Sequence, residues 1–313
     1  MMKKGKIVVF GSYVTDLMFR VPRLPVKGET LKASTFKLGP GGKGSNQAIA
    51  AKRAGAEVAM ITKIGKDPFG KIALDNFQKE NINSNFVFQD DERPTACASI
   101  LVDENSGNNQ IAISMGACEH ITNEEVESAR ETIKNAQILV TQLEANLDAT
   151  EMAMDIARQN EVMIILNPAP AQPLPIKFLK KIDILTPNET EASILCDGLK
   201  VETVEDAKNA AKILLEKGVK NVIITLGEKG AVLMNKEMEH HIESLKVDVI
   251  DTTGAGDAYN GGFAAALAEG KNILDAAKFA NVVGALSVTK IGTAPAMPYR
   301  KDIDDFIKQY DLS

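Results

Sequence analysis

A carboxylate follows a glycine-rich turn late in the chain. Residues 251–257 read Asp-Thr-Thr-Gly-Ala-Gly-Asp and precede a helical pattern of small residues at 258–268. Glycines at a helix start leave backbone N–H groups free, and these groups bind anions together with the helix dipole. Asp257 cannot itself hold a phosphate. It is therefore either a helix cap, or a base that takes a proton from a hydroxyl while the N–H groups stabilise a phosphoryl group.

A second glycine-rich stretch, Gly39-Pro-Gly-Gly-Lys-Gly-Ser-Asn46, precedes a predicted helix at 47–54. A dinucleotide-binding fingerprint would join the first strand directly to its helix, but a long irregular segment separates this stretch from the strand predicted at 6–11. A P-loop is excluded because Gly44 follows Lys43 where Ser or Thr is required. The stretch predicts a loop that approaches a small polyhydroxylated ligand, with donors at Lys43 and Asn46.

Further polar residues follow predicted strands. Asp16 comes after the first strand, where open α/β sheets bind ligands, although it also suits a turn. Glu144 ends the strand predicted at 138–143. Asn188 and Glu191 have the spacing of a helix start, so that a capping role accounts for them without a ligand.

The composition and charge of the chain exclude several classes of function. The chain has 313 residues, 44% hydrophobic and 25% charged, which is ordinary for a globular protein with a large core. Its net charge is −6 and no long Lys/Arg block is present, which argues against nucleic acid as a partner. The sequence has no apolar run long enough for a membrane span or a signal peptide. Three separated cysteines indicate a reducing compartment, so we expect a cytoplasmic protein.

Strands and helices alternate along most of the chain. This alternation predicts an α/β fold, a mostly parallel sheet with helices on both faces, as a single domain over 1–313. Segments 14–38 and 93–115 depart from it, because they contain short β-prone pieces and a hairpin. Together they predict a small β-sheet that forms a lid. The run 246–250, just before the first glycine turn, is also predicted to be a strand.

Seven motifs resemble those of the ribokinase family of ATP-dependent sugar kinases, in the same order over essentially the whole chain. They are Gly11-Ser12 with Asp16, Gly41–Gly44 with Asn46, Gln142–Glu144, Asn167–Ala171, Thr186–Glu191, Thr225–Gly227 and Asp251–Asp257. The resemblance implies an α/β domain with a small β-sheet lid, often a homodimer joined through the lids. It also implies transfer of the γ-phosphoryl group of MgATP to the primary hydroxyl of a sugar, O5 in ribose.

The resemblance implies roles for individual residues. Asp257 would be the base, and the anion hole would be formed by the N–H groups of Gly254, Ala255 and Gly256. The residues that would hold the sugar hydroxyls are Asp16, Gly42, Lys43, Asn46 and Glu144. Those that would line the ATP site are Asn188, Thr225, Gly227, Gly230, Gly256 and Asn281. Glu191 would place Mg²⁺ through water, which suits a strongly hydrated cation. An activating K⁺ would be bound by Asp251, Thr253, Ser287, Lys290 and Gly292.

Three positions depart from the family's pattern. Ala296 stands where a serine often ligates K⁺, so only its backbone oxygen is available there. Val14 stands where an asparagine often bonds a sugar hydroxyl, and an apolar side chain there would tolerate or prefer a sugar without that hydroxyl. Ribose stays the first expectation from the resemblance, and 2-deoxyribose is the alternative. Cys118 stands where the family often has Asn, and its role is open.

Other functions stay open beside this one. A nucleoside or fructose kinase is less favoured by the run of motifs. A catalytically inactive sugar-binding relative is disfavoured because Asp257 and its glycine turn are intact. A dinucleotide-dependent oxidoreductase is disfavoured by the misplaced fingerprint.

Overall fold

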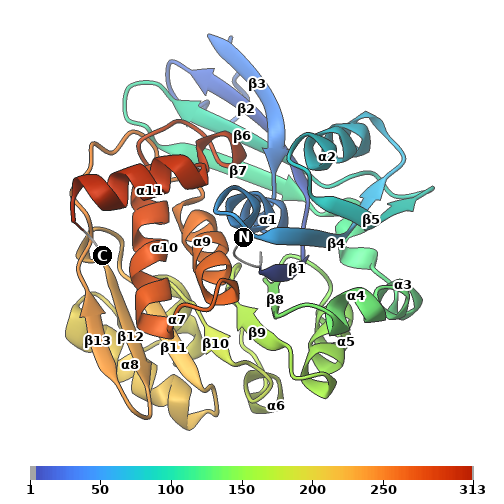
Figure 1. Ribbon diagram of the computed structural model, residues 1–313. Helices are drawn as coiled ribbons and strands as arrows, with labels where there is room; N and C mark the ends of the chain where they lie inside the picture. The colour runs from blue at the N-terminus through green and yellow to red at the C-terminus, as the bar shows by residue number, and fades with distance from the viewer. Residues whose placement is uncertain (1–4, 312–313) are drawn as a thin grey trace.

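The computed structural model describes residues 5–311, which form a large sheet and a small one (Figure 1). The large sheet has nine strands in the order β13-β12-β11-β10-β9-β8-β1-β4-β5. Pairing is parallel from β11 to β5, and β12 and β13 extend the sheet in antiparallel fashion. The strands are β1 (Lys6–Phe10), β4 (Glu57–Gly65), β5 (Asn83–Asp90), β8 (Ile138–Thr141), β9 (Met163–Leu166), β10 (Ile184–Leu185), β11 (Asn221–Thr225), β12 (Ala231–Asn235) and β13 (Glu239–Ile242).

Helices cover both faces of this sheet. In β1, Ile7 and Val9 pack into a core shared with α1, α9 and α10, whereas Val8 and Phe10 pack into a second core shared with α5 and α8. Burial on both faces explains why the parallel strands read as continuous apolar runs. The helices are α1 (Lys43–Arg53), α2 (Pro68–Lys79), α3 (Asn123–Ser128), α4 (Arg130–Lys134), α5 (Leu147–Gln159), α6 (Ile176–Leu179), α7 (Glu189–Leu195), α8 (Val204–Glu216), α9 (Ala255–Ala268), α10 (Ile273–Ser287) and α11 (Arg300–Gln309).

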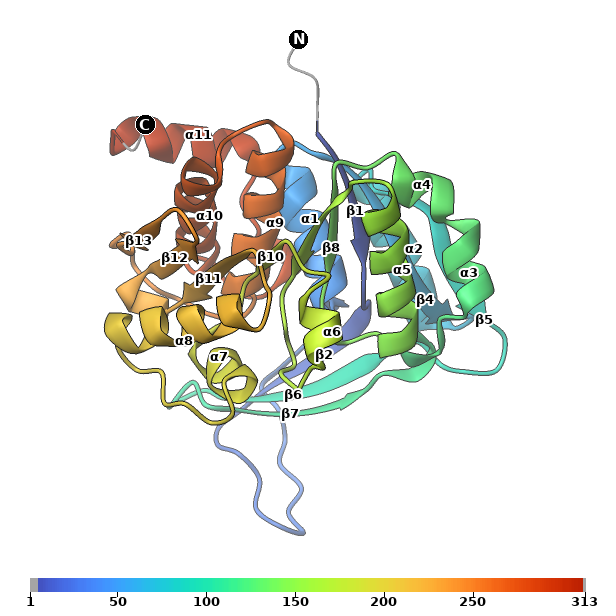
Figure 2. The same cartoon turned by 90° about the horizontal axis from the view of Figure 1, so that it is seen from below.

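A second, four-stranded sheet lies beside the main one (Figure 2). Its order is β3 (Thr35–Gly41), β2 (Val14–Val21), β6 (Cys97–Asp103) and β7 (Asn109–Ser114). The hairpin predicted within 93–115 is confirmed as β6 and β7. Segment 14–38 forms two strands, of which β3 runs on to Gly41, and the loop between them projects away from the rest of the chain (Figure 2). That this sheet acts as a lid stays a prediction.

One predicted strand, 246–250, is wrong. The chain has no regular structure there, and Val249 and Ile250 are 62% and 60% exposed. A strand needs a partner, but the main sheet already ends at β13. The N–H of Ile250 instead donates to the carbonyl of Val288 just after α10, at 2.8 Å.

Two helices begin earlier than the sequence predicts. The helix predicted at 47–54 begins at Lys43, and the one predicted at 258–268 begins at Ala255. Glycine has a low helix propensity, so the sequence did not indicate these two helix starts. Tertiary packing can override helix propensity. A Cβ on Gly44 would lie 2.6 Å from the backbone nitrogen of Ser12, so glycine is required where α1 passes the end of β1. In the described residues, 5–311, no helix is long and apolar enough to cross a membrane.

Candidate active site

The first turns of α1 and α9 converge near the carboxyl end of β1. The two helices lie side by side (Figure 1) and pack so closely that a Cβ on Gly261 would lie 2.5 Å from that of Ala50. Each helix follows a glycine with positive φ, 85° at Gly42 and 78° at Gly254, and neither glycine provides a side-chain cap. At α1 the first N–H groups are bound by Glu144 and Ser12, whereas the start of α9 keeps N–H groups without a partner in the described chain, so this helix N-terminus can bind an anion.

Asp257 lies in the first turn of α9 and is 6% exposed. Its Oδ2 accepts a hydrogen bond from Asn46 Nδ2 and its Oδ1 accepts one from Gln47 Nε2, both at 3.0 Å. Both partners belong to α1, so the carboxylate does not serve as a cap for its own helix. Burial raises the pKa of Asp257, while the charge of Lys43 and the two amide hydrogen bonds act in the opposite direction. A base with a raised pKa can take a proton from a hydroxyl.

Glu144 lies on the other side of Lys43. Its Oε2 accepts hydrogen bonds from the backbone N–H of Lys43, at 2.9 Å, and from the Ser12 hydroxyl. Burial raises the pKa of Glu144, and the charge of Lys43 opposes this. Burial alone would lower the pKa of Lys43, but the nearby carboxylates, Asp257 first among them, raise it. Lys43 is thus a fixed cation among acidic side chains.

Asp16, in β2, completes this acidic group. Burial and the neighbouring Glu144 raise the pKa of Asp16 to about 6, against the effect of the Thr293 hydroxyl. Gly41 of β3 pairs with Val14, and a Cβ on Gly41 would collide with the Asp16 carboxylate, so only glycine fits beside this side chain. Carboxylates that accept and amides that donate suit a ligand rich in hydroxyl groups.

Asn188 and Glu191 form the capping box that their spacing predicts. Asn188 Oδ1 accepts the Glu191 N–H at 2.8 Å, and Glu191 Oε2 accepts the Asn188 N–H at 2.9 Å. Burial raises the pKa of Glu191, and Lys43 opposes this. Each carboxylate oxygen has a second lone pair that can accept from a metal-bound water. Within residues 5–311, no group of three or more His, Cys, Asp and Glu side chains is arranged to hold a metal ion.

The predicted nucleotide residues gather at the carboxyl ends of β10 and β11. Asn188 pairs with Thr225 in a β-bridge. Gly227 and Gly230, with φ of 54° and 87°, turn the chain between β11 and β12. Asn281 reaches from α10 and donates to the carbonyl of Glu243 at 2.7 Å, so it borders the segment that leads to α9.

The predicted potassium residues come from two adjoining loops. Asp251 accepts the N–H of Thr253 and that of Gly292, each at 2.9 Å. These hydrogen bonds outweigh burial and lower the pKa of Asp251, so it carries a charge. Ser287 is buried and its hydroxyl donates to the carbonyl of Gly284 at 2.7 Å, while Lys290 is exposed. A carboxylate beside loop carbonyls provides the oxygen donors that a hard cation prefers.

The predicted anion hole is only partly free. The N–H of Ala255 donates to the carbonyl of Thr252 at 3.2 Å. The N–H groups of Gly254 and Gly256 have no partner among the described residues. A Cβ on Gly256 would meet no atom of the described chain within 4 Å, so the space before it is open.

Four residues of the site were given no role by the sequence reasoning, although Gln142 and Asn167 begin two of the family motifs. Gln47, Gln142 and Asn167 are buried and join Asp257 in one hydrogen-bonded chain. Thr293 contacts β3, where its hydroxyl donates to the carbonyl of Pro40 at 3.5 Å, and its Cα lies 3.4 Å from a Cβ built on Gly254. An amide side chain such as Gln47 within a helix of small residues was a signal that could have been used.

The three positions that depart from the family's pattern are all buried. Val14 begins β2 and is 1% exposed, and Ala296 is also 1% exposed. Cys118 is fully buried, its Sγ lies 3.9 Å from Thr62 Oγ1, and burial raises its pKa to about 12. It is therefore a neutral thiol and not a nucleophile.

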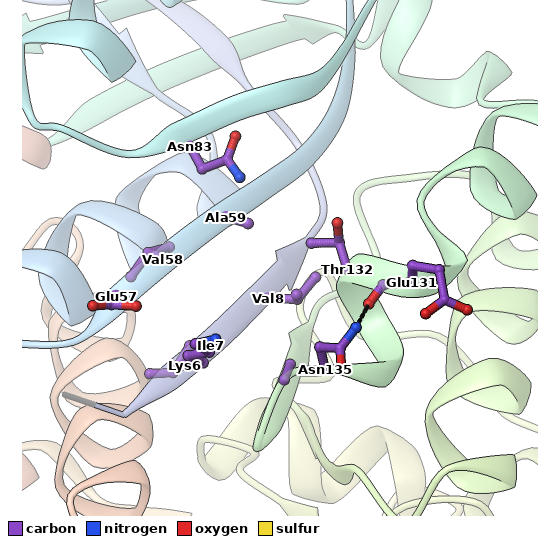
Figure 3. A pocket seen from close by; sticks show the side chains of 11 residues that line it. Lys6, Ile7, Val8, Glu57, Val58, Ala59, Asn83, Glu131, Thr132 and Asn135 are labelled. Carbon is purple, nitrogen blue, oxygen red and sulfur yellow. Dashed lines mark hydrogen bonds between the residues drawn. The ribbon is translucent and has the colours of Figure 1, made fainter. Parts of the chain in front are cut away.

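A cavity of about 400 Å³ lies at the amino ends of β1 and β4, away from the carboxyl ends where the candidate site lies (Figure 3). It opens between the starts of β1 and β4 and helix α4, with Lys6, Glu57 and Asn83 at its edge. Asn135 Nδ2 donates to the carbonyl of Glu131 at 2.6 Å on its far side (Figure 3). It contains none of the predicted site residues.

Comparisons with known proteins agree with the motifs. The family described as pfkB family carbohydrate kinase matches residues 4–300. A ribokinase of Haemophilus influenzae is 40% identical over 302 residues, covering 96% of this chain and 98% of that protein. A deoxyribokinase of Salmonella typhi is 37% identical over 302 residues, with the same coverage. The structure of an Arabidopsis thaliana ribokinase complexed with ribose and ATP is similar with a TM-score of 0.89, at 31% identity, over 98% of this chain and 99% of that one.

Proposed function

The chain belongs to the pfkB family of carbohydrate kinases, and from this premise we propose that it transfers the γ-phosphoryl group of MgATP to O5 of D-ribose. The products are D-ribose 5-phosphate and ADP. The observation that carries the proposal is the position of Asp257, buried beside the unpaired N–H groups of a helix start. A base next to anion donors is what phosphoryl transfer to a hydroxyl requires.

Asp257 takes the proton from O5 as that oxygen attacks the γ-phosphorus. Its two amide hydrogen bonds fix the direction of the carboxylate, and the charge of Lys43 limits the cost of a buried anion. The N–H groups of Gly254 and Gly256 donate to the phosphoryl oxygens, and that of Ala255 joins them if its turn hydrogen bond to Thr252 opens. The bond from the γ-phosphorus to the leaving oxygen of ADP breaks as the bond to O5 forms.

The sugar lies between β2 and the start of α1. Asp16 and Glu144 accept hydrogen bonds from its hydroxyl groups, and Lys43 donates one. Asn46 Oδ1 is buried without a partner in the described chain, so a sugar hydroxyl satisfies it. Gly42 lets the backbone approach the ring because it has no side chain.

ATP lies along Asn188, Thr225, Gly227 and Gly230, with Gly256 at its γ-phosphate and Asn281 at its outer end. Glu191 would hold Mg²⁺ through water, and this ion would supply positive charge next to the phosphates of ATP. Asp251 and Thr253, with the carbonyls of residues 287, 290 and 292, would hold K⁺, which would order the two loops beside the anion turn.

We also propose a homodimer joined through the small sheet. Its edge strands β3 and β7 expose apolar side chains, with Phe36 54%, Leu38 44%, Ile111 56% and Ile113 51% exposed. Unpaired edges with apolar side chains favour association. The mass in solution, measured by light scattering for the wild type and for Leu38→Glu, tests this.

In the described chain Cys97, Cys118 and Cys196 are free thiols, which supports a cytoplasmic location.

The second candidate substrate is 2-deoxyribose. Val14, an apolar residue, stands where the family often has a hydrogen-bonding asparagine, and a deoxyribokinase is 37% identical to this chain. An apolar contact discriminates against a hydroxyl only about 10- to 200-fold. Val14→Asn is therefore expected to raise the ratio of kcat/KM for ribose to that for deoxyribose.

The test is ATP consumption with each sugar, with and without K⁺. Preference for ribose supports the proposal, and preference for deoxyribose moves the substrate to the alternative and makes Val14 the specificity determinant. Fructose and adenosine serve as acceptors for the remaining alternatives. No turnover with any of these acceptors would contradict the proposed activity.

A further inference from the structure

A chain of amide side chains lies behind Asp257. Gln142 Nε2 donates to Gln47 Oε1 at 2.7 Å, and Gln47 Nε2 donates to both Asp257 Oδ1, at 3.0 Å, and Asn167 Oδ1, at 3.1 Å. Asn167 Nδ2 in turn donates to the carbonyl of Thr186 at 3.1 Å. The chain connects the ends of β8, β9 and β10 to the first turns of α1 and α9.

The neighbours of Gln47 fix which end of its amide faces the base. Its oxygen is occupied by the donor of Gln142, and Asn167 offers an oxygen to its nitrogen because the Asn167 nitrogen is bound elsewhere. A flipped amide would place its oxygen against the carboxylate of Asp257. Gln47 is 0% exposed, so water does not replace any of these hydrogen bonds.

We propose that Gln47 is a positioning residue for phosphoryl transfer, which holds the Asp257 carboxylate in one orientation and in its ionised form. This inference rests on the proposed role of Asp257 as the base. One of the two Asp257 oxygens is held by Gln47 and the other by Asn46. Since Asn46 also faces the sugar, Gln47 is the partner that remains unchanged when the sugar binds or leaves.

Other charges also act on Asp257 and must be separated from Gln47. Lys43, in α1, favours the ionised carboxylate. Glu144 after β8, Glu191 in α7 and Asp16 in β2 are close enough to interact with it and disfavour ionisation. None of these residues donates a hydrogen bond to Asp257 in the described chain. A change at Gln47 therefore alters one direct contact and leaves the surrounding charges in place.

The experiment replaces Gln47 by Met, which keeps about the same length, carries no charge and cannot donate to Asp257. We expect kcat to fall by about tenfold or more, with KM for sugar and ATP changed less. The acidic limb of the pH profile of kcat/KM should move upward by about one pH unit, because loss of a donor to a carboxylate raises its pKa. In the protein without substrates, the ¹³C carboxyl signal of Asp257, assigned by its loss in Asp257→Asn, should titrate at higher pH.

Gln142→Leu is the second variant and removes only the hydrogen bond that orients Gln47. It should shift the pH profile and the Asp257 titration in the same direction by a smaller amount. The matched control is Gln137→Leu at the other end of the sheet. The side chain of Gln137 makes two hydrogen bonds, accepting from the Lys6 N–H at 2.9 Å and donating to the Ala268 carbonyl at 3.1 Å.

The control should lower the melting temperature without moving the pH profile. The inference is overturned if the titration of Asp257 and the acidic limb are unchanged in both Gln47→Met and Gln142→Leu, or if Gln137→Leu shifts them equally. Failure of the proposed function is a different result, because it appears as absence of sugar phosphorylation by the wild type. The titration of Asp257 needs no turnover.

Discussion

The two sides of the reaction site are held in different ways. On the base side, Asn46, Gln47 and Asp257 lie on two packed helices and are almost fully buried. On the nucleotide side, Thr253 and Lys290 lie on exposed loops, and the path from β13 to α9 has no regular structure. The base side is thus built before any ligand arrives, whereas the loops of the nucleotide side have few contacts that fix them.

This difference suggests that the two sides have different roles, one in proton transfer and the other in binding ATP and cations. A buried, hydrogen-bonded carboxylate has one orientation, so the geometry of proton transfer is set by the fold. Exposed loops joined by a few hydrogen bonds, such as those of Asp251 to Thr253 and Gly292 and of Ile250 to Val288, can be ordered by ATP and cations. Changes on the base side should therefore affect kcat, and changes on the nucleotide side should affect ATP and K⁺ dependence.

The largest effect is expected for Asp257→Asn. The amide cannot accept the proton of O5, so kcat should fall about 10²- to 10⁴-fold while ATP binding, measured by calorimetry, is retained. The matched control is Asp275→Asn, an exposed acidic residue in the first turn of α10. It should leave kcat unchanged, and near-normal turnover in Asp257→Asn would remove this residue from the mechanism.

Substitutions of the two glycines at the turn distinguish backbone strain, expected at Gly254, from obstruction of the phosphate position, expected at Gly256. Gly254 has φ of 78°, so Gly254→Ala should destabilise the protein by about 1–2 kcal/mol. Gly256 is helical and faces open space, so Gly256→Ala should keep or raise stability by about 0.5–1 kcal/mol. It should still lower kcat/KM for ATP about tenfold, because its methyl group occupies the phosphate position. Thermal melting and ATP kinetics of both variants check this, and full activity of Gly256→Ala would argue against a phosphate at this turn.

The pH dependence of sugar binding tests Asp16. Its pKa of about 6 means that the carboxyl becomes protonated below that pH and loses its acceptor character toward the sugar. KM for the sugar should rise about tenfold per pH unit below 6. The folded protein holds this proton more tightly than the unfolded chain, so stability of the free protein should decrease as pH rises through 6. Asp16→Asn should abolish both dependences, and their persistence in that variant would assign them to another group.

The smallest effect is expected on the nucleotide side, for Asp251→Asn. Loss of its charge should raise the K⁺ concentration for half-maximal activation by about fivefold, with kcat at saturating K⁺ little changed. Rates measured over a K⁺ series check this, with Na⁺ as the comparison. An unchanged K⁺ dependence would place the cation elsewhere or show that none is used.

The main sheet and the local helix caps were predicted better from the sequence than the contacts between distant segments. Strands buried on both faces leave a strong apolar pattern, so the main sheet and the residues at its strand ends were predictable. The carboxylates Asp16, Glu144 and Asp257 were identified because a charge beside a strand end or a glycine turn needs an explanation. The capping box of Asn188 and Glu191 was predicted from spacing alone and is confirmed.

What was missed depends on packing between distant segments. Gln47 contacts Gln142, Asn167 and Asp257, and no local pattern shows which strand ends will surround it. The starts of α1 and α9 were placed too late, because glycine has a low helix propensity. Close packing against Ser12 requires the glycine at Gly44, whereas Gly256 is helical although it faces open space. The false strand at 246–250 had the right residues but no strand to pair with.

Phosphorylation of the 5-hydroxyl of ribose can be observed directly in the ¹³C and ³¹P NMR spectrum of the product formed from MgATP and ¹³C-labelled D-ribose. We expect one product in which phosphorus couples to C5, formed together with an equal amount of ADP. Phosphorus coupled to another carbon, or ADP formed at the same rate without sugar, would contradict this expectation.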